Sequence, residues 1–221
     1  MPDSNSESPF ARGFAALPDA VTSAVFLCTW IVPGWLGYPR VRDLTLLMLI
    51  EFVVMHSSGF TAAIFAMKDL SRFKRALSLT GLTAFYMIFI LGFSLAFDST
   101  WPIWGFVWLF VSRFLQLFTS DTQAPTKILR MFGAWVVSAI AYLGGVFATV
   151  LLPLPRLGIT PEVVDGLHLS GSGLWIEKPW TVLAFGTLYF ALLAKSKLMP
   201  VKIAVTAPGL SGAASRNPSR R

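Results

Sequence analysis

The sequence has few charged residues. Only 13% of its 221 residues are Asp, Glu, Lys or Arg, whereas 55% are hydrophobic and the mean hydropathy is +0.66. Soluble domains carry about 25% charged residues, so this chain has too few polar side chains to cover the surface of a water-soluble domain. The composition excludes an ordinary soluble enzyme and a disordered protein, and it indicates a protein that resides in a lipid bilayer.

Residues that carry redox or metal chemistry are also scarce. The chain has one cysteine, Cys28, and two histidines, His56 and His168. One cysteine excludes an internal disulfide. Because His168 falls in a loop, the chain alone cannot supply a bis-histidine haem site between two spans. The sequence also lacks a phosphate-binding P-loop, a dinucleotide-binding fingerprint and a His-Glu-x-x-His motif. It therefore assigns no cofactor.

Long apolar runs are what the sequence has in abundance. A helix needs about 20 apolar residues, with a range of about 17–25, to cross the hydrocarbon core. Five runs reach that range and the last has 16 residues. None alternates with period two, which excludes a β-barrel. The predicted fold class is all-α, a polytopic transmembrane bundle of six membrane-spanning helices. The runs cover residues 20–37, 44–67, 76–97, 101–118, 131–152 and 179–194.

The runs divide the chain into three parts. Residues 1–19 form a polar N-terminal segment, and residues 20–197 form the transmembrane domain. An outer loop over 153–178 separates the last two runs. Residues 198–221 are rich in Ser, Gly, Ala and Pro and end in arginines, which predicts a disordered basic tail.

Basic residues set the expected orientation. With the N-terminus inside and six crossings, 14 of the 18 Lys and Arg residues fall on the inner side and 4 on the outer side. This asymmetry predicts a multi-pass protein of the cytoplasmic membrane with both termini cytoplasmic. The asymmetry also supports the short last span. If that span did not cross the membrane, the tail arginines would lie on the outer side and the asymmetry would be lost. The inner positive charge favours contact with anionic lipids rather than with nucleic acid.

Two ionisable residues lie inside the second run. Glu51 and His56 each cost roughly 2.5–3.5 kcal/mol to place at the bilayer centre, so they are candidate functional residues. They are five positions apart, which separates them by about 140° around a helix. Glu51 is either a proton or cation carrier or a partner for a neighbouring helix. His56 either binds a cofactor, gates protonation or packs as a polar group.

Small residues follow the histidine and recur in the fifth run. Ser57 and Ser58 are candidate intramembrane polar residues, either in helix packing or lining a substrate path. Small residues four positions apart let helices approach closely. The residues with this spacing are Gly59 and Ala63 in the second run, and Ala141 and Gly145 in the fifth.

The outer loop holds the remaining candidates. Thr160 followed by Pro161 predicts the start of a short helix. On it, Glu162, Asp165 and His168 recur every three residues and share one face. Two carboxylates and an imidazole form a weak candidate metal triad. A charged face turned toward water explains the same pattern.

These observations leave three functions open. The first is a non-catalytic membrane component or accessory subunit, whose partners are the bilayer and other membrane proteins. The second is a small proton-coupled transporter built on Glu51 and His56. The third is a membrane enzyme with an outward-facing acid and histidine site. The sequence identifies no substrate.

Overall fold

A computed structural model describes residues 9–67, 69–119, 125–167 and 172–199, with the backbone alone over 112–119 and 125–131. The described part is helical and contains no strand. The long helices are α1 (Pro9–Ile31), α3 (Pro39–Ala66), α4 (Arg72–Ala96), α5 (Trp101–Thr119), α6 (Pro125–Leu151) and α9 (Pro179–Leu198). The short helices are α2 (Pro33–Leu36), α7 (Pro161–Gly166) and α8 (Leu174–Glu177).

Five of the long helices confirm the prediction of a membrane protein. α1, α3, α4, the Phe132–Leu151 part of α6, and α9 are each long and apolar enough to span a bilayer. They include α9, which begins with the short last run at Pro179 and extends it by four residues to Leu198. The run at 101–118 coincides with α5, but the apolar stretch with described side chains there is Trp101–Val111, which is shorter than a span. A sixth crossing therefore stays a prediction.

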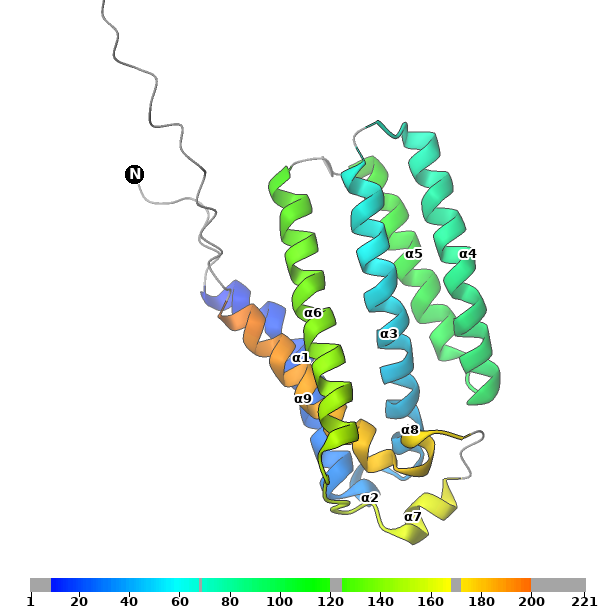
Figure 1. The fold of residues 1–221 in the computed structure, drawn as a ribbon, viewed down its shortest axis with the longest axis vertical. Coiled ribbons are helices and arrows are strands. Elements are labelled where there is room, and N and C mark those ends of the chain that lie inside the picture. The colour runs from blue at the N-terminus through cyan, green and yellow to red at the C-terminus, as the bar shows by residue number, and fades with distance from the viewer. Residues whose placement is uncertain (1–8, 68, 120–124, 168–171, 200–221) are drawn as a thin grey trace, which may run out of the picture.

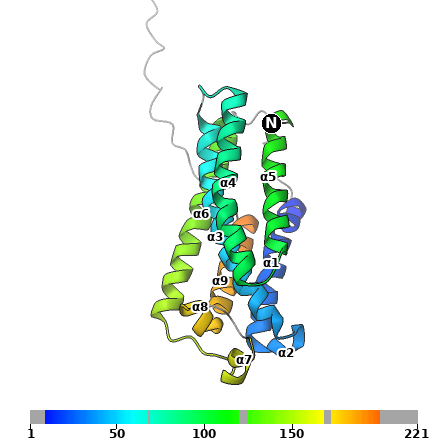
Figure 2. The same cartoon turned by 90° about the vertical axis from the view of Figure 1, so that its right-hand side faces the viewer.

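The helices form two groups in space. α3, α4, α5 and α6 run upright and roughly parallel to one another, as both views show (Figures 1 and 2). α1 and α9 lie side by side and cross the bundle obliquely (Figure 1). The N-terminal end of α1 and the C-terminal end of α9 lie at the level of the middle of α6 rather than at its end (Figure 1). One half of α3 and α6 therefore extends past the α1–α9 pair.

The first helix differs from the first apolar run. α1 begins at Pro9, so it extends into the segment assigned to a polar N-terminus, because Phe10, Phe14 and Leu17 continue the apolar pattern backwards. It ends at Ile31, just before Pro33 starts α2. Residues 20–37 thus cover most of one helix and all of a short second one.

α1 packs tightly on α9 through a glycine. Phe26 is fully buried and lies so close to Gly186 that a Cβ built there would stand 2.3 Å from its ring. The Phe26 ring also stacks on Phe190, with centroids 5.7 Å apart. Gly186 thus allows the two helix axes to approach where any larger residue would separate them.

The opposite face of α9 packs on α6 in the same way. Phe185 is fully buried, and a Cβ at Gly145 would stand 2.5 Å from its ring. Tyr142 meets the Phe185 ring edge-on, with centroids 4.8 Å apart. α9 therefore packs between α1 and α6, and at each interface an aromatic ring lies directly against a glycine of the other helix. A second apolar cluster, centred on Leu46 and Ile90, joins α3 to α4.

The outer loop docks on the end of α1. The Gly158 amide donates to the Trp30 carbonyl at 3.0 Å, and the Trp30 indole donates to the Pro155 carbonyl at 3.1 Å. Ile159 is fully buried, and the Arg156 guanidinium lies 4.5 Å from the centre of the Trp180 ring. The loop is therefore part of the folded domain and closes the end of the bundle where α1 stops.

Candidate functional site

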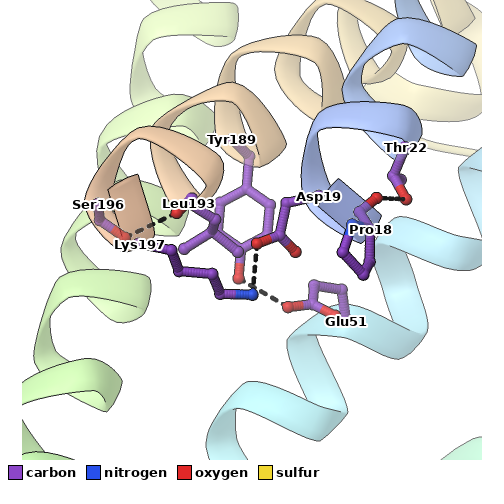
Figure 3. A network of polar contacts seen from close by, with 8 residues as sticks. All are labelled: Pro18, Asp19, Thr22, Glu51, Tyr189, Leu193, Ser196 and Lys197. Atoms are coloured by element: carbon purple, nitrogen blue, oxygen red, sulfur yellow. Dashed lines mark hydrogen bonds and ion pairs between the residues drawn. The ribbon is translucent and has the colours of Figure 1, made fainter. Parts of the chain in front are cut away.

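Glu51 lies in the interior of the helix bundle, near the middle of α3. The Tyr189 hydroxyl on α9 donates a 2.7 Å hydrogen bond to its Oε1 atom (Figure 3). Tyr189 is itself fully buried. A phenol presented to a carboxylate satisfies one of its acceptor positions, and a carboxylate has about four. This contact ties α3 to α9 through a buried polar pair.

An ion pair between α1 and α9 stands next to this contact. The Lys197 ammonium and the Asp19 carboxylate lie 2.5 Å apart, and the lysine side chain extends toward Glu51 (Figure 3). The Asp19 side chain is 13% exposed and the Lys197 side chain 43% exposed. The group of three contains two acids and one base, so it carries a net charge of −1 when all three are ionised.

α6 completes the surroundings of the carboxylate. The Ser138 side chain is in a hydrogen-bonding interaction with the Tyr189 hydroxyl. Tyr142 packs edge-on against Tyr189, with ring centroids 5.5 Å apart, and its hydroxyl donates to the Met48 carbonyl at 2.9 Å. Polar contacts in this one region therefore connect α1, α3, α6 and α9.

Glu51 also borders an open pocket of about 310 Å³ between α3 and α6. Its polar lining includes Ser58 and Ser138, and its aromatic lining is Trp135. The apolar lining consists of Val54, Met55 and Ala134. A concave, largely apolar site with a few convergent polar groups is the usual form of a small-molecule site.

Trp135 closes one side of this pocket against α3. A Cβ at Gly59 would stand 2.6 Å from the indole Nε1 and Cε2 atoms, so the ring edge rests directly on the glycine. The indole N–H is buried and has no hydrogen-bond partner among the described atoms. Phe132 packs on the ring from the next turn, with centroids 5.3 Å apart. The position of Trp135 is thus fixed by both helices.

His56 has a different environment from Glu51. Its Nδ1 atom lies 3.0 Å from the Phe52 carbonyl, and its ring is 4.0 Å from the Phe52 ring, both on its own helix. Ser57 and Ser58 likewise donate to the Val54 carbonyl, at 2.9 Å and 2.7 Å. The structure brings Ser58 to the pocket of Glu51 and does not bring His56 there.

The predicted packing residues occupy different positions. Gly59 lies against Trp135 and Gly145 against Phe185, so each glycine accommodates an aromatic ring rather than a second small residue. Ala141 lies partly buried at the edge of the main apolar core. Ala63 is exposed.

The outer-loop candidates lie far from this region in the fold. Thr160 caps α7, as the sequence predicts, and accepts from the Val163 amide. Glu162 and Asp165 are exposed on α7. A hydrogen bond from Thr160 holds the pKa of Glu162 below its ordinary value. His168 lies outside the described residues, so the triad is untested, and the described His, Cys, Asp and Glu residues form no metal-binding group of three or more.

Comparison with known proteins adds no relative: no family model, curated protein or solved structure matches this chain. The site therefore has to be interpreted from its own chemistry.

Sequence reasoning identified Glu51 and Ser58 but missed their partners. Tyr189 is one of 31 aromatic residues, and nothing in its neighbours singles it out. Asp19 was assigned to the polar N-terminus and Lys197 to the edge of the tail. The apolar residues that precede Asp19 were the available signal, because they indicate that this acid lies within a helix.

Proposed function

We propose that this chain is a six-span, non-catalytic component of the cytoplasmic membrane, such as an accessory subunit. The supporting observation is how its in-span polar groups are used. Glu51 accepts from Tyr189, Asp19 pairs with Lys197, and Tyr142 donates to α3, each contact joining two helices. Polar groups that bond across helices hold a bundle in one arrangement. Glu51 is in this interpretation a structural residue.

The topology within this proposal places both termini in the cytoplasm, with anionic lipids at that face and other membrane proteins as partners. The basic residues support it through the 14-to-4 distribution. The α3–α4 connection then faces the cytoplasm, and the loop before α9 faces outward.

Cysteine labelling tests this topology. In a Cys28→Ser background, a cysteine at the exposed position Ser172 should react with a membrane-impermeant maleimide in intact cells. A cysteine at exposed Asp69 should react only after the membrane is permeabilised. The opposite pattern, or equal reaction of both positions from outside, would overturn the orientation.

Partner recovery tests the accessory role. The Glu51→Gln variant keeps an acceptor for Tyr189, so it should fold and should retain any stoichiometric membrane partner of the wild-type chain. Recovery is measured by quantitative mass spectrometry after affinity purification from cross-linked membranes. Loss of the partner from a well-folded Glu51→Gln protein would show that the carboxylate does more than hold helices together.

A proton-coupled carrier is the second candidate, favoured by the pocket that Glu51 borders. An intramembrane acid beside a pocket is where a carrier would exchange protons. In this case proteoliposomes loaded with a pH-sensitive dye would respond to substrate, and Glu51→Gln would abolish the response. The two experiments separate the candidates, since only the carrier requires an ionisable group at position 51.

A further inference from the structure

We propose that the pocket between α3 and α6 is a binding site for an organic monocation, an ammonium group carried on a compact apolar body. This inference does not depend on the accessory role or on transport. It concerns what the pocket binds, and it follows from the charge, the aromatic surface and the shape at one place in the bundle.

The first step is the charge. Glu51 belongs to a group of two acids and one base, and the base, Lys197, is already paired with Asp19 at 2.5 Å. The Glu51 carboxylate has one partner in Tyr189 and borders the pocket. An ionised Glu51 carboxylate has further acceptor positions, and the three groups then carry a net charge of −1, so the site attracts a positively charged ligand that donates hydrogen bonds.

The second step is the aromatic wall. Trp135 on α6 lines the same pocket as Glu51 on α3, and its contacts with Gly59 and Phe132 hold it there. Tryptophan is the best aromatic partner for a cation within about 6 Å of its ring, and the attraction increases where water is excluded. A carboxylate and an indole that line one pocket are together complementary to an ammonium group.

The third step separates an organic cation from a metal ion. A hard cation such as Ca²⁺ takes six to eight oxygen ligands. The oxygen-bearing side chains of this pocket are Glu51, Ser58 and Ser138, and its other lining is apolar. Three side chains are too few for such an ion, whereas Val54, Met55 and Ala134 suit the carbon skeleton of an amine. The volume of about 310 Å³ fits a compact molecule of this kind.

The fourth step concerns access. The N-terminal end of α1 and the C-terminal end of α9 lie at the level of the middle of α6, so that pair does not cover the stretch of α3 and α6 beyond them (Figure 1). Lys197, which extends toward Glu51, lies in the last turn of α9 (Figure 3). The pocket is open, is lined by Glu51 and has no α1 or α9 residue in its lining, so that pair does not close it.

Equilibrium binding of radiolabelled benzylammonium to the full chain in phosphatidylcholine nanodiscs tests the site. Radiolabelled benzyl alcohol, which is neutral and nearly the same shape, is the matched probe. We expect benzylammonium to bind at least tenfold more weakly to Glu51→Gln than to the wild type. Asp98→Asn removes an exposed carboxylate at the α4–α5 turn and should leave binding unchanged. Benzyl alcohol should not distinguish the variants.

A steric variant makes the test independent of Glu51. Ala134 lines the pocket and is exposed within it, so Ala134→Leu fills the space while leaving the Tyr189 contact in place. It should also weaken benzylammonium binding at least tenfold. Benzylammonium binding that is unchanged in Ala134→Leu, or in a folded Glu51→Gln protein, would overturn the proposal. Equal loss of benzyl alcohol binding in Glu51→Gln would overturn it as well.

A primary ammonium group comes either from a soluble amine or from an aminophospholipid headgroup. Repeating the measurement in nanodiscs that contain phosphatidylethanolamine distinguishes the two. Competition by that lipid, lost in Glu51→Gln, identifies a lipid ligand. Unchanged benzylammonium binding identifies a soluble amine. Both results support an ammonium site and differ only in its source.

Discussion

Replacing Gly186 by leucine is expected to separate α1 from α9 and to lower the free energy of unfolding by about 3 kcal/mol, the upper end for overpacking. A Cβ at this position would stand 2.3 Å from Cε1 of Phe26, far inside van der Waals contact. Phe26 has no space to move into, because it is fully buried and stacked on Phe190. The helices must therefore shift apart and lose the rest of their interface.

The matched control is Gly92→Leu on α4. A Cβ at Gly92 meets no atom within 4 Å, and the residue is exposed, so the added side chain faces lipid. We expect a change within about 0.5 kcal/mol, as for substitutions away from packed features. Both are measured by SDS-titrated unfolding in mixed micelles. A Gly186→Leu protein as stable as Gly92→Leu would show that α1 and α9 do not pack through this glycine.

The second large effect is expected on the other face of the same helix. Phe185→Ala removes a fully buried ring from the contact between α9 and α6, and should destabilise the protein by about 3 kcal/mol. In a bilayer the loss comes mainly from the cavity and the lost packing, since lipid tails are as apolar as the core. Phe147→Ala, an exposed residue on α6, is the control and should be nearly neutral.

A double variant sharpens this prediction. A Cβ at Gly145 would occupy the space of the Phe185 ring, 2.5 Å from its Cδ2 atom. Gly145→Ala should therefore be harmful alone and less harmful in the Phe185→Ala background, where the space is empty. A double-mutant cycle measures this coupling. Additive effects would mean that the two residues do not share the contact that the structure describes.

Much of the fold could be predicted from the sequence, because a bilayer imposes a length on every crossing helix. The run at 44–67 became α3 and the run at 179–194 became α9, each extended by a few residues. The exception is the start of α1, because the sequence places Asp19 in the polar segment 1–19 whereas the helix begins at Pro9. The charge of Asp19 is offset by Lys197, which lies more than 170 positions away in the chain, and no local pattern reveals such a pair.

Only part of the candidate site could be predicted from the sequence, for the same reason. Glu51 stands out because an acid in an apolar run is costly. Tyr189, Trp135 and Ser138 do not stand out, since aromatic and small residues occur throughout membrane helices. Likewise, Gly59 and Gly145 have the spacing expected for helix contact, but only coordinates show that a ring fills each. The sequence indicates that Glu51 needs a hydrogen-bond partner inside the membrane, and the packing of the helices determines that this partner is Tyr189.

The pairing of α1 with α9 has a consequence for how the protein is made. Among the described helices α1 is synthesised first and α9 last, yet the two pack closely against each other at Gly186. Until α9 has been synthesised, Phe26 and Asp19 on α1 lack their partners Phe190 and Lys197. The final architecture therefore cannot form helix by helix in order of synthesis. α1 must therefore stay in the membrane without its α9 contacts until α9 is inserted, and the insertion of α9 completes this interface.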